Sequence, residues 1–385
     1  MKLDSSTIKT ALRAAEQPLL LETGEQLIRA SSCWNTCSIL GIDTEFLRER
    51  TYRAKLGLVQ VSDGVTAWLI DTIEINDLAP LQKLLSNKRI CKILHSGSED
   101  LEVLWHTLRV IPKPMVDTQI ACAMLGQPLQ MSYTHAVKWL ADIEVDKELT
   151  RSNWIHRPLK PEQLHYAATD VVFLPAMYEQ LRSALNQSGR WPWLLEEVER
   201  MASNSTLPPD IGQAYMRING GRHLDRPSLH VLKALAAWRE ESAARRNIAR
   251  GFVVPDSVLL QLAIEKPRTR SALLEIRGLH PKAVQRHQQE LLKVIEDNLN
   301  LNSPIQQATP LDRRQRRVLS AMRKLVQHEA SALGMDPALL ASKKQLESIL
   351  HAIDAGVPVP ERMSGWREPI ITRKLLELAA TADSG

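Results

Sequence analysis

Two acidic residues stand where they could bind a metal ion. The apolar run over residues 38–42 is typical of a buried strand, and Asp43 and Glu45 come at its end. Residues two apart in a strand point to the same face, so the two carboxylates would repel each other and lose hydration together. A hard divalent cation would remove that conflict. The alternative is a strand that runs out into a solvated turn with both acids exposed, and this stretch alone does not separate the two interpretations.

A third acid, Asp100, is expected near the start of a helix. The apolar strand 90–94 is followed by Ser98, which we expect to cap a helix over residues 99–108. Asp100 would then lie in the first helical turn. It is either another metal ligand or an acid stabilised there by the helix dipole. For Asp117, further along, we favour helix capping over catalysis.

The fourth acid, Asp170, is paired with a phenol. Pro161 is suited to the first turn of a helix that carries both Tyr166 and Asp170. These two residues are four apart and so share a helix face, whereas His165 points about 100° away. A Tyr/Asp pair of this kind is either a hydrogen-bonded surface pair or a carboxylate ligand with a hydroxyl beside it.

The elements that must position these residues indicate an α/β domain. Strands followed by alternating strands and helices predict a mixed sheet, and the turn signal Asp63-Gly64 predicts an antiparallel meander in its first part. The expected helices are 6–31 and 77–85, and the expected strands of the meander are 38–43, 56–62 and 65–70.

The charge distribution differs between the two halves of the chain. The chain has 385 residues, a net charge of +5 and a sequence pI of about 9.0. Residues 1–212 carry 22 Lys+Arg and 26 Asp+Glu, a net of −4, whereas residues 213–385 carry 27 and 18, a net of +9. This split suits a metal-dependent domain followed by a region that binds nucleic acid. The four cysteines form no CxxC pair, which argues against a zinc site or a disulfide framework.

The rear half is expected to be helical from residue 225 to about 297, with a second helical set after it. Arginines at several positions give the first set a basic surface that could contact phosphates, the alternative being a surface that only aids solubility. The candidate RNA-binding residues are Arg239, Arg245, Arg246, Arg250 and Arg277.

The order and spacing of these motifs carry a resemblance. Asp43-Thr44-Glu45-Phe46, the run from His95 to Leu101, and Tyr166 with Asp170 occur in the order seen in the DEDD superfamily of 3′→5′ exonucleases, in its tyrosine-bearing subgroup. The match also covers Leu56-Gly57-Leu58-Val59-Gln60. The region 225–300 resembles the HRDC-type helical domain of RecQ-type helicases and ribonuclease D. Together they resemble the ribonuclease D family.

The resemblance implies a fold and a site. The fold would be a ribonuclease H-like α/β exonuclease domain with a mixed sheet, followed by two all-α HRDC-type domains, the second a divergent copy with only a faint repeat. The expected domains are 1–208, 213–300 and 308–385. The expected ligands of two divalent ions, Mg²⁺ or Mn²⁺, are Asp43, Glu45, Asp100 and Asp170. Tyr166 would orient the attacking water, and His165, although placed like the histidine of the sister subgroup, would be incidental.

The implied function is that of a metal-dependent 3′→5′ exoribonuclease. It would release 5′-mononucleotides from RNA 3′ ends by two-metal-ion hydrolysis, with tRNA precursors that carry 3′ extensions as the expected partners. No obligate protein partner and no membrane are implied. The first residues contain no apolar signal-peptide core, and a cytoplasmic location is expected. Two alternatives stay open: an RNA-binding protein without catalysis and a 3′→5′ DNA exonuclease.

Overall fold

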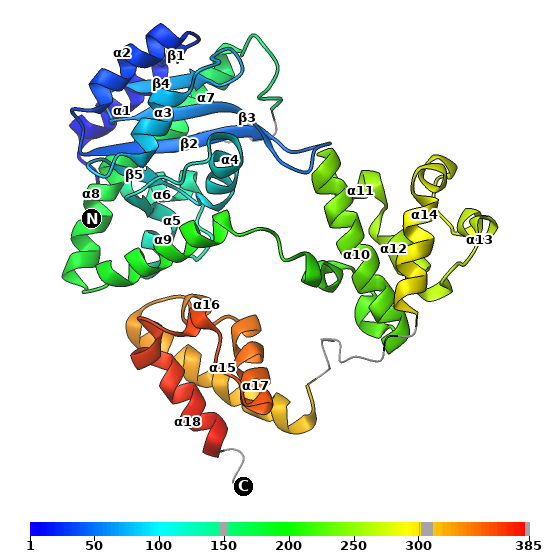
Figure 1. Ribbon diagram of the computed structural model, residues 1–385. Helices are drawn as coiled ribbons and strands as arrows, with labels where there is room; N and C mark the ends of the chain where they lie inside the picture. Colours follow the sequence, from blue (N-terminus) through cyan, green and yellow to red (C-terminus); the bar gives the residue numbers. More distant parts are fainter. Residues whose placement is uncertain (146–151, 300, 302–310, 382–385) are drawn as a thin grey trace. The chain divides into compact units, whose positions relative to one another are not determined.

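A computed structural model describes residues 1–145, 152–299, 301 and 311–381 (Figure 1). The chain forms two compact units. The first comprises Met1–Leu47, Leu56–Thr206 and Leu311–Gly385, and the second comprises Arg48–Lys55 and Leu207–Pro310. The predicted domain boundary near residue 308 lies outside the described residues. Among the described residues, no helix combines the length and the apolar character that a membrane span requires.

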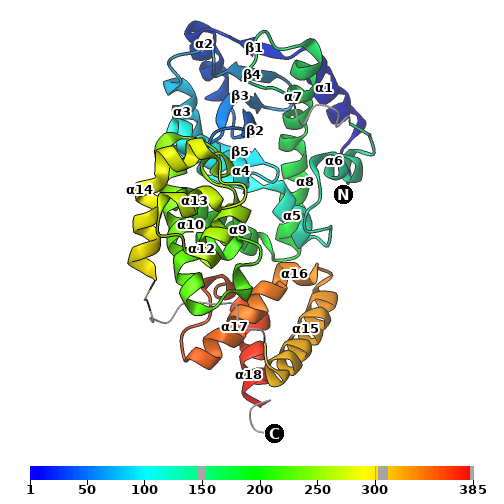
Figure 2. The same ribbon diagram turned by 90° about the vertical axis from the view of Figure 1, so that its right-hand side faces the viewer.

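A six-stranded mixed sheet forms the centre of the first unit, as predicted. Its strand order is β1-β4-β3-β2-β5-β6, and Figure 2 shows the first five following one another in this order. β3 and β4 are antiparallel, whereas β1 with β4, β2 with β5, and β5 with β6 are parallel. The strands are β1 (Leu19–Leu21), β2 (Ile39–Leu47), β3 (Lys55–Ser62), β4 (Ala67–Asp71), β5 (Cys91–Leu94) and β6 (Met115–Asp117).

The single helix predicted over 6–31 is wrong. Two helices, α1 (Ser5–Glu16) and α2 (Gly24–Trp34), flank the short edge strand β1. Thr23 is the N-cap of α2 and forms a capping box with Gln26, so a new helix begins there. Leu19, inside the range predicted as helix, is half exposed on β1. The apolar residues of this range therefore belong to separate elements and do not form one face of a single helix.

Helix α7 (Pro161–Val172) begins at Pro161, as predicted, and it packs closely on β2. Gly41 of β2 makes this approach possible, because a Cβ atom there would lie 2.7 Å from the carbonyl oxygen of Val171. This close approach of the two backbones places Asp170, the neighbour of Val171, beside the strand that carries Asp43. The packing of one helix on one glycine thus joins two distant sequence motifs.

The predicted cap at Ser98 is wrong, although the helix is present. α4 (Ser98–Leu108) begins after Gly97, which is the N-cap and has no side chain to accept a hydrogen bond. The Gly97 N–H instead donates to the Asp117 carboxylate at 2.8 Å. Asp117 also caps α5, accepting from the backbone of Gln119 and Ile120, which confirms its predicted capping role.

The remaining helices of the front part cover the sheet and extend from it. α8 follows α7 and packs against β2 and β5, while α9 packs against α4 and β6. These helices are α3 (Ala79–Ser86), α5 (Thr118–Met124), α6 (Tyr133–Ala141), α8 (Leu174–Gln187) and α9 (Trp191–Thr206).

The second unit is helical, as expected. The long α10 (Arg226–Arg246) packs on α12 and α14 around an apolar core. The chain segment between β2 and β3 belongs to this unit, because Tyr52 packs against that core and its hydroxyl donates to Glu240 at 2.9 Å. The other helices are α11 (Arg250–Val253), α12 (Asp256–Glu265), α13 (Arg270–Glu275) and α14 (Pro281–Asn298), preceded by η1 (Ile211–Arg217) and η2 (Gly221–His223).

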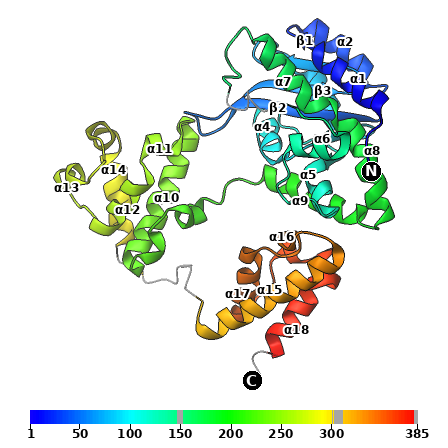
Figure 3. The same ribbon diagram turned by 180° about the vertical axis from the view of Figure 1, so that it is seen from behind.

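The last segment is a separate helical set, in which α15 and α18 lie side by side (Figure 3). Its order of a 21-residue helix, a four-residue helix and a third helix repeats that of α10, α11 and α12. The elements are α15 (Arg313–Leu333), α16 (Pro337–Leu340), α17 (Lys343–Ala355), η3 (Glu361–Met363), η4 (Glu368–Thr372) and α18 (Arg373–Thr381).

Candidate metal centre

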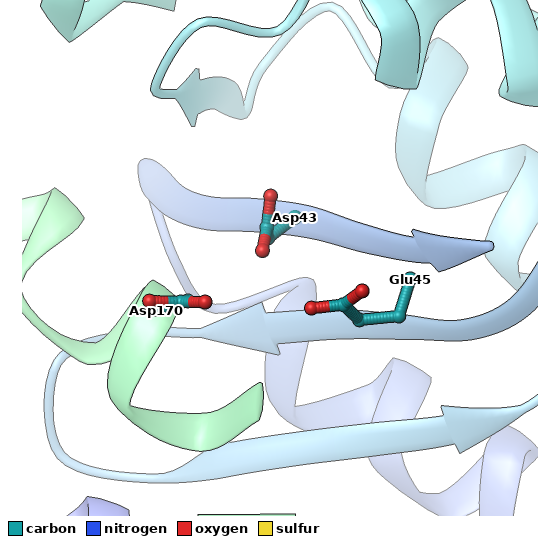
Figure 4. Close-up of side chains that lie close together, drawn as sticks. All are labelled: Asp43, Glu45 and Asp170. Carbon is teal, nitrogen blue, oxygen red and sulfur yellow. The ribbon is translucent and has the colours of Figure 1, made fainter. Parts of the chain in front are cut away.

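Three carboxylates gather where β2 meets α7. Asp43, Glu45 and Asp170 each offer an oxygen, and these oxygens all lie within 4.8 Å of one another (Figure 4). Asp43 and Glu45 lie inside β2, since this strand continues to Leu47. The alternative of a strand ending in a solvated turn is therefore wrong.

Asp100 lies next to this cluster. It is buried in the first turn of α4, as predicted, and its carboxylate accepts a hydrogen bond from the Thr44 hydroxyl. Thr44 stands on β2 between the two acids of that strand. The charge of Asp100 also raises the pKa of Asp43 and of Glu45. The four predicted acids thus share one electrostatic environment, although only three place their oxygens within the compact cluster.

The acids disfavour each other's ionisation. Burial, followed by the charges of Asp100 and Asp170, raises the pKa of Asp43 well above its usual value. Burial and the charges of Asp170 and Asp100 raise the pKa of Glu45 to about 9. Burial raises the pKa of Asp100 to about 6 and that of Asp170 to about 7. Each ordinary pKa is near 4, so this site favours added positive charge.

The donor set fits a hard divalent cation. All the candidate ligands are carboxylate oxygens, which Mg²⁺ and Mn²⁺ prefer over nitrogen and sulfur donors. A bound cation would also offset the burial that raises all four pKa values and the repulsion that adds to it at Asp43 and Glu45. The type of donor atom and the electrostatics of the site therefore both favour a hard divalent cation.

Tyr166 shares the face of α7 with Asp170, as predicted. A hydrogen bond from its hydroxyl opposes the effect of burial on the pKa of Asp170. The ring of Tyr166 packs near Trp154, with centroids 6.0 Å apart. His165 points elsewhere, since its Nδ1 atom lies 3.1 Å from the Ala15 carbonyl oxygen of α1. This geometry agrees with the expectation that His165 is incidental.

A buried ion pair fixes the segment that precedes α7. The Arg157 guanidinium binds the fully buried Asp71 carboxylate of β4 and donates to the Gly57 carbonyl at 2.8 Å. Gly57 is required here, because a Cβ atom would lie 2.3 Å from the Trp154 carbonyl oxygen. The contacts of Arg157 thus hold the backbone that places Trp154 against Tyr166.

Sequence reasoning missed Tyr133, which lies close to the site. Its hydroxyl donates to the Thr169 carbonyl at 2.8 Å, and burial together with the charges of Asp170 and Asp43 raises its pKa. The ring of His95 packs edge-on against it at 5.7 Å. His95 occurs in a quoted motif, but no spacing rule connects Tyr133 to any of the acids.

The predicted RNA-binding arginines divide into two groups. Arg239 is only 4% exposed and bonds Asp256 at 2.5 Å, so it stabilises the helical unit and is not available to a phosphate. Arg250 bonds Glu240 at 2.6 Å, and Arg246 lies 3.1 Å from the His287 ring nitrogen. Arg245 and Arg277 are exposed. Only these last two keep the surface position that we expected for the whole set.

Comparisons with known proteins match both parts of the chain. A family model described as 3′-5′ exonuclease matches residues 20–186, and one described as HRDC domain matches residues 228–295. Ribonuclease D of Pseudomonas paraeruginosa (strain DSM 24068 / PA7) is 37% identical over 357 residues, covering 91% of this chain and 94% of that protein. Ribonuclease D of Shewanella sp. (strain ANA-3) is 35% identical over 349 residues, covering 88% of each.

Solved structures agree with these relatives. The crystal structure of Escherichia coli RNase D, described as an exoribonuclease involved in structured RNA processing, superposes with a TM-score of 0.87 at 30% identity. That match covers 95% of this chain and 99% of that one. The catalytic core of RRP6 from Trypanosoma brucei gives a TM-score of 0.60 at 21% identity over 73% of this chain and 79% of that one, a likeness of fold alone.

Proposed function

The chain belongs to the ribonuclease D family of 3′-5′ exoribonucleases, and on that premise we propose that it trims the 3′ ends of structured RNA by two-metal-ion hydrolysis. The observation that carries this proposal is the cluster of Asp43, Glu45 and Asp170 within the matched exonuclease region. Transfer RNA precursors with 3′ extensions are the substrates that we expect, and the cytoplasm is the expected location.

The four carboxylates would hold the metal ions. Asp43, Glu45 and Asp170 offer oxygens within one cluster, and Asp100 lies close enough to raise the pKa of two of them. Two divalent ions bound here would lower the pKa of water and neutralise charge on the leaving oxygen. Hydrolysis forms a bond between water oxygen and phosphorus, and breaks the bond to the 3′ oxygen of the preceding nucleotide. The product is a 5′-mononucleotide.

Tyr166 is proposed as the residue that orients water. Its hydroxyl bonds Asp170 and therefore lies beside the carboxylate cluster. A tyrosine hydroxyl is a poor general base at neutral pH, so it would not remove a proton. Because its one hydrogen is donated to Asp170, its oxygen would accept a hydrogen bond from the attacking water. The packing of its ring near Trp154 supports this role, since a fixed ring holds the hydroxyl in place.

A substrate comparison tests the proposal. The protein would be incubated with Mg²⁺ or Mn²⁺ and a hairpin RNA that carries a 3′ extension, an unstructured RNA, or single-stranded DNA. We expect stepwise release of 5′-mononucleotides from both RNAs. Release of nucleotides from the single-stranded DNA should be slower than from either RNA. Equal activity on DNA would favour the DNA exonuclease, and RNA binding without any release in wild type would favour the non-catalytic alternative.

The matched variants are Asp100→Asn and Glu99→Gln. The two acids are neighbours in the first turn of α4, but Asp100 is buried and Glu99 is exposed. Loss of activity in the first variant and retention in the second would assign the chemistry to the buried cluster. Similar activity in both would remove Asp100 from the proposed ligand set.

A further inference from the structure

The most concentrated positive charge of the rear half lies on one helix. Residues 313–324, in the first half of α15, contain five arginines and one lysine and no acid. This is half of the twelve Lys and Arg residues between 308 and 385. The arginines that we had predicted to bind RNA belong to the other unit, and three of those five have intramolecular partners.

The charges of α15 fall on one side of the helix. At 100° per residue, five of the six cations and three uncharged polar residues lie within an arc of about 120°. The opposite side is apolar and buried, with Val318, Met322 and Val326 among its residues. The cations of the arc are all exposed, and they define the α15 basic face: Arg313, Arg316, Arg317, Arg323 and Lys324.

The composition of the α15 basic face favours a nucleic acid backbone over a membrane. The uncharged members of the arc are Ser320, Gln327 and Ser331. A helix that lies in a membrane interface needs an apolar side free to enter the lipid, whereas here the apolar side is already buried in the protein. Cations with short polar residues between them instead suit a row of phosphates, which they neutralise with release of counterions.

The length of the face suits several nucleotides. From Arg313 to Lys324 the helix rises about 16 Å, at about 1.5 Å per residue. The flexible stems of Arg and Lys extend this reach, and contact with the phosphates needs no particular base sequence. We propose that the α15 basic face is a phosphate-backbone binding surface for structured RNA, one that supplies affinity without base specificity. This inference rests on the proposed function, since it concerns the binding of the same substrate.

The test measures RNA binding by the full-length protein in EDTA, so that no hydrolysis occurs. The probe is a synthetic hairpin RNA with a single-stranded 3′ extension, titrated at several salt concentrations. In the triple variant Arg313→Ala/Arg317→Ala/Lys324→Ala we expect the Kd to rise at least tenfold. The slope of log K against log salt should become shallower by about 2 to 3, because each of the three lost phosphate contacts accounts for about 0.7 on a single strand and about 0.9 on a duplex.

Two further variants separate this inference from general charge effects. The double variant Arg245→Ala/Arg277→Ala removes two exposed arginines from the other unit, and we expect a smaller effect because they do not belong to a continuous row. The double variant Arg313→Lys/Arg317→Lys keeps the positive charge at all three positions, since residue 324 is already a lysine. It should retain the wild-type salt slope, because counterion release depends on charge.

Several outcomes would overturn the inference. One is a triple variant that binds the hairpin RNA with wild-type affinity and slope. Another is a triple variant that keeps RNA binding but loses binding to vesicles containing phosphatidylserine, which would assign the face to a membrane. A wild-type protein that binds the RNA through α15 but never hydrolyses it with Mg²⁺ or Mn²⁺ would contradict the proposed function and leave the binding surface standing.

Discussion

Two regions of the first unit bury carboxylates, and they do so in opposite ways. At the metal centre, like charges meet between β2 and α7, and the pKa of each acid is raised. At the contact between α9 and the last helical segment, a single acid, Glu197, is surrounded by cations. Burial raises the pKa of Glu197, but the hydrogen bond and the charge of Arg367 outweigh burial, and its pKa is lowered.

The Glu197 cluster is fully partnered. Glu197 binds the completely buried Arg367 and accepts from the Trp366 indole N–H at 3.0 Å and from Arg200 at 2.9 Å. Trp366 stacks on Trp193 of α9 with centroids 4.9 Å apart. Burial of a carboxylate is thus common to both regions, and the sign of the neighbouring charges distinguishes a structural ion pair from a candidate metal site.

The largest effect is expected from removing a charge at the metal centre. Asp43→Asn should lower turnover by at least about 10³-fold, because loss of one metal ligand removes several kcal/mol of charge stabilisation. In EDTA the same variant should be at least as stable as wild type, since it removes a repelling charge. Nucleotide release and thermal unfolding would be measured together. Near wild-type turnover at saturating Mg²⁺ would contradict the assignment.

The next effect concerns the hydroxyl beside Asp170. Tyr166→Phe keeps the ring and its packing near Trp154, so we expect turnover to fall by about 10²–10⁴-fold with RNA affinity unchanged. His165→Ala is the matched control on the preceding residue, and its turnover should stay close to wild type because that imidazole faces α1. A harmful His165→Ala with a harmless Tyr166→Phe would place the protein in the histidine-bearing subgroup.

At the Glu197 cluster the expected effect is on stability. Glu197→Gln leaves the buried Arg367 without its charge partner, which should cost about 3–5 kcal/mol in the free energy of unfolding. Glu199→Gln is the control on the same helix, because its ion pair with Lys113 is exposed and should contribute less than about 1 kcal/mol. Urea denaturation would compare them, and equal midpoints for the two variants would refute the distinction between the regions.

The smallest effect is the pH dependence of the metal-free protein. The acids at the metal centre have higher pKa values in the folded protein than in the unfolded chain. At any pH between a folded-state pKa and its unfolded value, the folded state therefore binds more protons than the unfolded state. The free energy of unfolding in EDTA should thus decrease as the pH rises from about 4 to about 9, because the folded-state pKa values of Asp100, Asp170 and Glu45 are about 6, 7 and 9. Mg²⁺ should raise the Tm more at pH 8 than at pH 5.5, and Asp43→Asn should reduce that difference. An equal Mg²⁺ effect at both pH values would speak against a cation at these acids.

The sequence determined those features that depend on short-range backbone geometry. Alternation along a strand placed Asp43 and Glu45 on one face, and the helical repeat placed Tyr166 with Asp170, whatever the surrounding fold. Asp117 was recognised as a cap for the same reason. The mixed sheet followed from the order of apolar strands and helices, although the first helix was predicted too long because a three-residue edge strand carries almost no periodic signal.

Only the tertiary structure decided which distant groups meet. The approach of α7 to β2 over Gly41 brings Asp170 to Asp43, and nothing in either motif specifies it. Arg239, which we predicted from the sequence to bind RNA, is instead buried and paired with Asp256, where it stabilises the helical unit. Glu197 and Arg367 are 170 residues apart, and neither carries a local pattern. Such contacts depend on the combined packing of whole elements, whereas periodicity depends only on the geometry of one element at a time.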